Sequence, residues 1–506
     1  METLRTQVLV VGSGVAGCLT AQGLLARFDD VLIVERGADV SHAERLRSGN
    51  HEAPVPTALH HEVSRGEWRE KGFQCVYALG GTANHWTGRT PRLLPVDFRM
   101  RSRYGVMDDW PLSYKDLEPW YARAEAELAI AGQDDNPRTP RSRPFPLPAH
   151  PLSPADLLVK ACFPEGALVT LPQARPTRDV GERPACCGSG TCSLCPVDSK
   201  YTPLNTHIPA LRRSPKLRFL TEAVVVSLDA GGGRRVRSAL LLRGTGQRLH
   251  VEADWFVLAG GAIENAAIVL RSSGLKPHRL SGRYLADHAD LVVTARIEKD
   301  GFPNHGASQT TSLLYEFYDG AFRATRSGAL GSVKNRPELD VTHFVLEAAL
   351  ERGLRGQALR RDSAAEFRRQ VGITFQLEDP PDPENHVRIG QAQGPLGLPE
   401  TQFYFKRPSP YVMRSRDAIV ESLPRYLASL GVRRLEVSEI EGRAGHILGT
   451  CRMGDAARGV VDPQLRYHEA DNLYIVGASA FPTSSPSNPT LTLAALALRL
   501  GEHLGA

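Results

Sequence analysis

The sequence lacks any long apolar run. No stretch approaches the about 18 consecutive apolar residues that a membrane-spanning helix needs, so no transmembrane segment is expected. The start, Met-Glu-Thr-Leu-Arg-Thr, also lacks the charged and apolar regions of a secretory signal and runs straight into an apolar strand. We therefore expect a globular protein that is cytoplasmic by default. Export bound to a partner that carries a signal peptide stays open.

The chain also lacks a large excess of charge of either sign. The chain has 61 lysines and arginines against 56 aspartates and glutamates, a net charge of +5, and no block of like charge stands out. This balance lacks the basic patch of a nucleic-acid-binding protein, so we expect no nucleic-acid partner. At 506 residues, of which 42% are hydrophobic, the chain is long enough for two interleaved domains.

Cysteine is sparse, with eight residues in the chain, and four of them fall between residues 186 and 195. Such clustering argues for local chemistry rather than for a disulfide framework. The remaining four are interpreted as ordinary buried thiols, namely Cys18, Cys75, Cys162 and Cys451.

Apolar strands in three widely separated parts of the chain indicate one sheet built from distant segments. Residues 7–35 follow the pattern strand, glycine turn, helix, strand, and residues 255–270 repeat a strand, a glycine turn and a helix. A third strand begins at Leu473 and ends at Gly477, and an apolar helix spans residues 491–504. The pattern predicts an α/β fold with a Rossmann-type domain assembled from discontinuous segments.

The segments between these strands predict a second, α+β domain of sheet and helices inserted over the first. Residues 338–372 have a helical pattern, and residues 385–407 alternate like strands around the turn 394–397. Residues 136–154 are dense in proline and arginine, which predicts an extended crossing. The predicted nucleotide-binding segments are 1–100, 200–300 and 440–506, and the substrate domain with its connecting loops takes 101–199 and 301–439.

A dinucleotide site is predicted at the first glycine turn. Gly12, Gly14 and Gly17 follow a strand and open a helix, so the backbone can approach a pyrophosphate at the positive end of that helix. Glu35 ends the next strand, where it can bind a ribose diol. A glycine turn without a ligand is the alternative. The spacing alone does not separate FAD from NAD.

Several motifs together resemble one family. They are Gly80-Gly81-Thr-Ala-Asn84-His85-Trp86, Trp110 to Tyr121, Val257 to Glu264, Gly282 to His288, His446 to Gly454, and Asn472 to Thr490. This combination resembles the glucose-methanol-choline (GMC) oxidoreductases, and is most similar in motif to their iron-sulphur sugar dehydrogenases and pyranose 2-oxidases. Residues 300–440 resemble the family least.

The resemblance implies FAD as the cofactor, oxidation of an alcohol, and a catalytic pair formed by His446 and Asn488. The cofactor-binding residues that it implies are Gly12, Gly14, Gly17, Glu35, Gly81, Asn84, His85, Thr87, Val225, Gly477, Ala478, Asn488 and Thr490. The pair also makes chemical sense. A histidine near neutral pKa can take the hydroxyl proton of an alcohol that loses a hydride, and an asparagine can donate to and accept from the same hydroxyl. A core histidine that donates to backbone is the alternative for His446.

His85 adds a more specific expectation. In the pyranose 2-oxidases and iron-sulphur sugar dehydrogenases that Asn84-His85-Trp86-Thr87 resembles, the histidine is bonded covalently to the flavin, and Thr87 would then lie near the reactive edge of the ring. A histidine that only packs beside the flavin is the alternative.

The cysteine cluster decides which electron acceptor is expected. Cys186, Cys192 and Cys195 resemble the ligands of an iron-sulphur cluster, of [3Fe–4S] or [4Fe–4S] type, and Cys187 offers a fourth thiol. Structural zinc, local disulfides and inert thiols are the alternatives.

With an iron-sulphur cluster, the enzyme would be a dehydrogenase of a sugar, glycoside or other polyol that passes electrons to a cytochrome or quinone, with a small companion subunit as a further partner. Without one, a peroxide-forming oxidase similar to pyranose 2-oxidase is the alternative. A flavoprotein that has lost catalysis and serves electron transfer or assembly is the alternative of another class.

Overall fold

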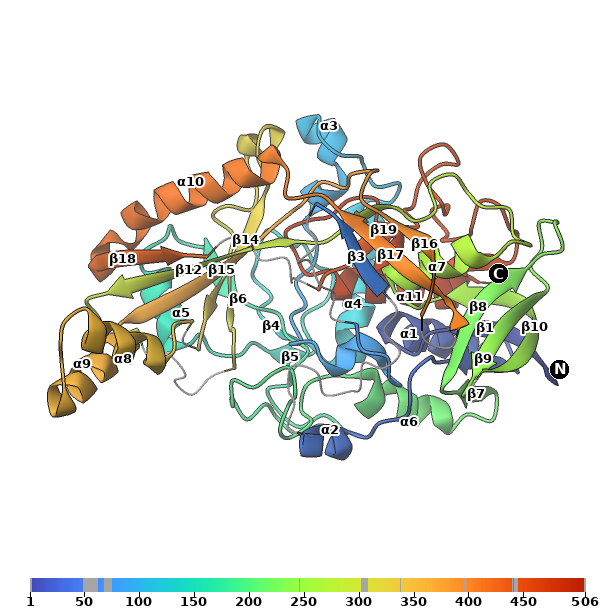
Figure 1. The fold of residues 1–506 in the computed structure, drawn as a ribbon, viewed down its shortest axis with the longest axis horizontal. Helices are drawn as coiled ribbons and strands as arrows, with labels where there is room; N and C mark the ends of the chain where they lie inside the picture. Colours follow the sequence, from blue (N-terminus) through green and yellow to red (C-terminus); the bar gives the residue numbers. More distant parts are fainter. Residues whose placement is uncertain are drawn as a thin grey trace.

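The structure is a computed structural model that describes residues 2–48, 62–67, 75–244, 246–301, 308–336, 338–394, 397–438, 440 and 445–504. Figure 1 shows two ends of different architecture, with the strands β1 and β7 to β10 at one end and β12, β14, β15 and β18 at the other. Helix α4 (Tyr114–Leu128) lies between these two ends in the view.

The predicted Rossmann-type sheet is present. It has seven strands in the order β7-β2-β1-β10-β9-β8, with β20 also pairing with β10. The strands β7, β2, β1, β10 and β20 run parallel, whereas β9 and β8 pair antiparallel. The bounds are β1 (Glu2–Val11), β2 (Val31–Val34), β7 (Leu217–Leu220), β8 (Ala223–Asp229), β9 (Ser238–Arg243), β10 (Gln247–Leu258) and β20 (Leu473–Ile475). The beginning, middle and end of the chain thus meet in one sheet, as predicted.

Helices pack on this sheet through small residues. A Cβ atom on Gly23 of α1 (Val15–Leu24) would lie 2.7 Å from the Gly501 carbonyl carbon of α11 (Thr490–His503), so the two helices touch along their backbones. Helix α4 joins them, because the Tyr121 hydroxyl lies 2.8 Å from Thr492 Oγ1. The last helix is therefore fixed over the sheet directly after the Asn488 segment.

The second sheet has six strands in the order β18-β12-β15-β14-β13-β6, all antiparallel. Its bounds are β6 (Leu168–Thr170), β12 (Ala289–Ile297), β13 (Ser312–Leu314), β14 (Ala329–Lys334), β15 (Gln370–Leu377) and β18 (Val432–Val437). Apolar residues of this sheet form a separate core with α5 (Pro154–Lys160) and α10 (Pro410–Tyr426). The segment predicted to be helical, 338–372, contains α8 (Val341–Leu350) and α9 (Gly356–Arg368), but its last three residues belong to β15, which begins at Gln370.

A third sheet has the order β19-β11-β16-β17-β3. Its bounds are β3 (Glu62–Gly66), β11 (Arg283–Ala286), β16 (His386–Gln393), β17 (Pro399–Phe405) and β19 (Leu448–Thr450). The strands predicted at 385–407 are β16 and β17, whereas Pro395 and Leu396 of the predicted turn lie outside the described residues.

The other elements are short. They are α2 (His42–Ser48), α3 (Met100–Tyr104), α6 (His207–Arg212), α7 (Ala262–Arg271) and the pair β4 (Ala131–Gly132) and β5 (Leu147–Pro148). The segment 136–154 is irregular apart from β5 and the start of α5, consistent with its proline content. The domain limits stay a prediction; β12 lies in the six-stranded sheet although its residues fall within the segment predicted for the nucleotide domain. Among the described residues, no helix has the length and apolarity to cross a bilayer.

Candidate active site

A cavity of about 620 Å³ lies at the carboxyl ends of the parallel strands, where β1, β2, β10 and β20 give way to loops. This is the edge at which open parallel sheets bind ligands. Twelve of the predicted site residues line the cavity together. They are Gly12, Gly14, Glu35, Gly81, His85, Thr87, Val225, His446, Gly477, Ala478, Asn488 and Thr490.

The glycine turn is shaped for close approach of a ligand to the backbone. Gly12 has a φ of +101°, and a Cβ atom there would lie 2.6 Å from the Ala259 carbonyl oxygen. A Cβ atom on Gly17 would lie 1.9 Å from the Gly12 oxygen, so Gly17 serves the packing of helix on turn and does not line the cavity. Gly14 differs, because a Cβ atom there meets nothing within 4 Å. That open space at the start of α1 fits a pyrophosphate.

Glu35 is buried at the end of β2. Its carboxylate accepts hydrogen bonds from the Ser13 hydroxyl at 2.6 Å, the Ser13 backbone N–H at 3.0 Å and the Gly37 N–H at 2.9 Å. Burial raises the pKa of Glu35, and these hydrogen bonds oppose that rise. The carboxylate is thereby fixed at the cavity wall, in the place where a ribose diol would meet it.

The segment around His85 forms another wall of the cavity. His85 caps a short 3-10 helix (Gly81–Asn84) and is buried. Asn84 turns away from the cavity, with its side-chain amide donating to the Leu79 carbonyl at 2.8 Å. The buried Lys200 ammonium donates to the carbonyls of Asn84 at 3.3 Å and Trp86, so it holds the backbone on both sides of His85.

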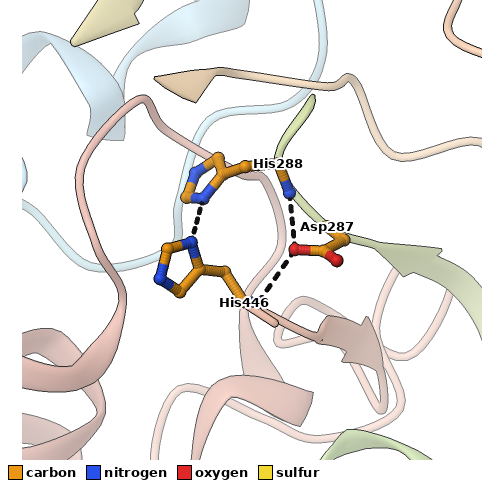
Figure 2. Close-up of side chains that lie close together, drawn as sticks. All are labelled: Asp287, His288 and His446. Atoms are coloured by element: carbon orange, nitrogen blue, oxygen red, sulfur yellow. Dashed lines mark hydrogen bonds between the residues drawn. The ribbon is translucent and has the colours of Figure 1, made fainter. Parts of the chain in front are cut away.

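His446 is placed by strand register. In the antiparallel pair of β11 and β19, Ala286 lies opposite Leu448, and His288 and His446 each lie two residues beyond this pair. Their Nδ1 atoms lie 2.7 Å apart (Figure 2). Asp287 Oδ1 accepts the backbone N–H groups of both histidines, at 2.7 Å from His288 and 2.8 Å from His446. The ring nitrogen and carboxylate oxygen atoms of these three residues all lie within 4.8 Å of one another, a spacing that could hold a metal ion. The hydrogen bonds between the residues account for this spacing.

The hydrogen bonds of these three residues define the tautomer of neutral His446. His288 Nε2 contacts the Ser485 carbonyl oxygen, which only accepts, so Nε2 of His288 carries a proton. A neutral His288 then accepts at Nδ1, and His446 donates to it from Nδ1–H. His446 Nε2 is left with a lone pair, 2.9 Å from the Asn488 amide nitrogen, which donates to it. The atom that lines the cavity with Asn488 is therefore a base.

Asn488 lies in the loop before α11. Neighbouring serines fix this loop: the Ser487 hydroxyl donates to the Arg92 carbonyl at 3.1 Å and lies 3.0 Å from the Tyr318 hydroxyl. His446 and Asn488 therefore come from segments that are anchored independently, and they meet at the cavity.

The four clustered cysteines also converge. They line one small cavity of about 10 Å³, the space of a single water, together with Arg175 and Lys200. Arg175 Nη1 donates to the Cys192 thiol at 2.5 Å. All four cysteines are free, and among the described residues no three thiols lie close enough to serve one ion. Tetrahedral zinc needs sulfur atoms about 3.8 Å apart, so this spacing disfavours a zinc site. Thiolates and a loop rich in N–H groups are the donor set of an iron-sulphur cluster.

This loop also reaches the large cavity. Ser193, between Cys192 and Cys195 in the sequence, lines the large cavity, and its carbonyl accepts from Lys200 at 2.8 Å. The cysteine loop and the His85 segment are thus held by the same ammonium group.

Sequence reasoning missed three features of the site. It named His288 only as the end of the motif Gly282 to His288, without the contact to His446. It gave no role to Arg175 or Lys200, because neither lies in a recognisable motif.

Comparisons with known proteins agree with this geometry. A sequence profile described as GMC oxidoreductase matches residues 427–497. The fructose dehydrogenase large subunit of Gluconobacter japonicus is 27% identical over 99% of this chain and 98% of its own length. The 6'''-hydroxyparomomycin C oxidase of Streptomyces lividus is 29% identical over 99% of this chain and 92% of its own. Among solved structures, an Aspergillus oryzae RIB40 formate oxidase variant, described for its FAD modification, has a TM-score of 0.67 at 15% identity, covering 99% of this chain and 98% of that one.

Proposed function

Because this chain belongs to the GMC oxidoreductases and depends on FAD, we propose that it is a dehydrogenase that oxidises an alcohol group of a sugar, glycoside or other polyol. FAD, when bound, supplies the hydride acceptor for such a reaction. Gly14, Glu35, Val225 and Gly477 would hold it, since all four line the large cavity. The names of the relatives support a sugar-like substrate: one is a fructose dehydrogenase large subunit and another is a 6'''-hydroxyparomomycin C oxidase.

In this proposal His446 and Asn488 handle the substrate hydroxyl. Nε2 of His446 accepts the hydroxyl proton, and the Asn488 amide, 2.9 Å from that atom, orients the same oxygen. The proton on Nδ1 of His446 is held by His288, which keeps the basic nitrogen directed into the cavity. His85 forms a covalent bond to the flavin in this proposal, which its position on the cavity wall supports.

The observation that favours a dehydrogenase is that one small cavity is lined by Cys186, Cys187, Cys192 and Cys195. Ser193, in the same loop, lines the large cavity. An iron-sulphur cluster on these thiols, when bound, would supply one-electron transfer to a cytochrome or quinone. A relative named as a large subunit supports a companion subunit as a further partner. The second candidate is an oxidase that forms hydrogen peroxide, favoured by the oxidase relative at 29% identity.

The test is anaerobic purification followed by iron and sulfide analysis, electron paramagnetic resonance, and anaerobic bleaching of the flavin by sugars, glycosides and polyols. We expect iron and sulfide at the thiols. Cys192→Ser should lose the resonance signal and slow transfer to a cytochrome, whereas substrate still bleaches the flavin. Cys162→Ser, at a half-buried thiol outside the cluster, is the matched control. Protein without iron that consumes oxygen with substrate would support the oxidase instead, and a flavin that no alcohol bleaches would contradict both.

A further inference from the structure

A buried arginine at the large cavity has no role in the reaction described above. Arg89, four residues after His85, lines this cavity and is only 8% exposed. Among the described residues, neither its Nε nor its Nη2 atom has a hydrogen-bond partner, and no ion pair reaches its side chain. Burying a guanidinium group without such partners is costly, so a residue of this kind is expected to meet its partner in a ligand.

Arg89 lies at the reacting end of the cavity. It is within electrostatic reach of Asp290, which is two residues after His288 and opposite Gln376 in the β12–β15 pair. The Gln376 amide nitrogen in turn lies 3.4 Å from His446 Nδ1. Arg89 therefore lies on the side of the catalytic histidine rather than at the glycine turn.

The charges around Arg89 are mainly positive. Arg336 also lines the cavity, and Lys334 is close enough to Arg89 for the two cations to repel each other. Burial lowers the pKa of Arg89 to about 10 and that of Lys334 to about 8. Asp290 and Glu338 are the carboxylates that face this group, and neither forms an ion pair with Arg89 within the described residues. Cations therefore outnumber carboxylates around Arg89.

We propose that this end of the cavity binds a carboxylate carried by the substrate, so that the enzyme prefers a sugar acid or another polyhydroxy acid to the neutral sugar. The guanidinium group of Arg89 matches a carboxylate in planar geometry and would bind it in two parallel hydrogen bonds. Arg336, which also lines the cavity, adds electrostatic attraction for this carboxylate. The same charges repel a cationic amino sugar. This inference rests on the proposed oxidation of an alcohol and narrows its substrate class.

The test compares matched pairs that differ only in charge: glucose with glucuronate, and methyl glucoside with methyl glucuronide. Anaerobic bleaching of the flavin gives kcat/KM for each. We expect the acid to exceed its neutral partner by about 10–100-fold, the usual value of a hydrogen bond to a charged group. Arg89→Met should remove that preference, so that acid and neutral partner have similar kcat/KM values, and Arg89→Lys should keep part of it. Arg248→Met, at an exposed arginine of β10, is the control and should keep the full preference.

Other outcomes overturn the inference. Equal use of acid and neutral partner by the unchanged enzyme would do so, as would a preference for sugar phosphates over the acids. Loss of FAD from folded Arg89→Met and Arg89→Lys proteins would assign the arginine to the flavin. If no alcohol bleaches the flavin, the proposed function fails, but the inference keeps its own readout: glucuronate should still perturb the flavin absorption spectrum, and Arg89→Met should abolish that perturbation. Without such a perturbation in the unchanged protein, the inference fails as well.

Discussion

His288 Nδ1 lies 2.7 Å from His446 Nδ1, directly beyond the paired ends of β11 and β19 (Figure 2). Two neutral imidazoles can share one hydrogen bond in only two ways. The Ser485 carbonyl beyond His288 selects between them, since it requires a proton on His288 Nε2. A backbone carbonyl thereby determines which nitrogen of His446 is basic.

His288→Leu should therefore impair catalysis through its effect on His446, not through a contact with the substrate. It removes the acceptor that holds the Nδ1 proton of His446, so we expect kcat to fall by about 10–100-fold, as for partners that orient a ligand residue in other sites. Because the acidic limb of the kcat/KM profile reports the base, it should also shift. His288→Gln supplies one acceptor and one donor and should recover most of the activity. Equal profiles for the Leu and Gln variants would contradict a tautomer-setting role.

His446→Ala tests the base directly. We expect kcat/KM to fall by about 10²–10⁴ while FAD stays bound, because this is the usual contribution of a positioned general base. Asn488→Ala should lose less, since the amide only orients the hydroxyl. Steady-state kinetics with a flavin absorbance check would measure both. Full activity of His446→Ala at neutral pH would remove this histidine from the mechanism.

Substitution by alanine should have different effects at Gly12 and at Gly14. Gly12→Ala places a Cβ atom against the Ala259 oxygen at a φ of +101°, so it should lower the free energy of unfolding by about 1–3 kcal/mol. Gly14→Ala meets nothing within 4 Å and its φ of −68° suits alanine, so the apoprotein should melt as before. The methyl group would enter the cavity, however, and should lower the flavin content per chain. Thermal melting of apoprotein and the ratio of flavin to protein absorbance separate the two effects.

The covalent flavin predicted at His85 has a simple test. Acid-precipitated protein should keep its yellow colour in the pellet, and His85→Ala should release all flavin to the supernatant. If the unchanged, fully loaded protein also releases all its flavin, His85 only packs beside the ring.

The sequence predicted the nucleotide end of the molecule well, because that end depends on local patterns. A strand, a glycine turn and a helix at residues 7–27 specify backbone geometry by residue type, and the structure has them as β1 and α1. The predicted cavity-lining residues converge largely for the same reason. Gly17 and Asn84 do not line the cavity, since one packs the helix onto the turn and the other binds its own loop.

The substrate end could not be predicted, because it is made by long-range pairing. Arg89 is held in an isolated β-bridge with Gln173, and Lys200 joins two loops more than a hundred residues apart in the chain. No local periodicity encodes such contacts. The six-stranded antiparallel sheet also depends on pairing between distant segments, so the sequence of its strands gave few identifiable strand patterns.

The burial of the thiols predicts the order in which they are alkylated. Thiolate is the reactive form, and burial raises the pKa of Cys18 and raises that of Cys451 to about 12. Neither should react with iodoacetamide at pH 8 in folded protein. Cys75 and Cys162, predicted to be buried, are only half-buried and should react slowly, and the exposed Cys187 should react first. Burial also raises the pKa of Cys186, so it should follow Cys187.

Anaerobic reconstitution with iron and sulfide should change this order in a way that identifies the ligands. Peptide mass spectrometry should find Cys186, Cys192 and Cys195 protected, with Cys162 labelled as before to show that the reagent is active. Protection of Cys187 as well would indicate four ligands, whereas its continued labelling would indicate three. If reconstituted protein labels all four at the rates of the apoprotein, the thiols hold no cluster. The route to a one-electron acceptor then disappears, and direct reaction with oxygen becomes the better account of how the enzyme is reoxidised.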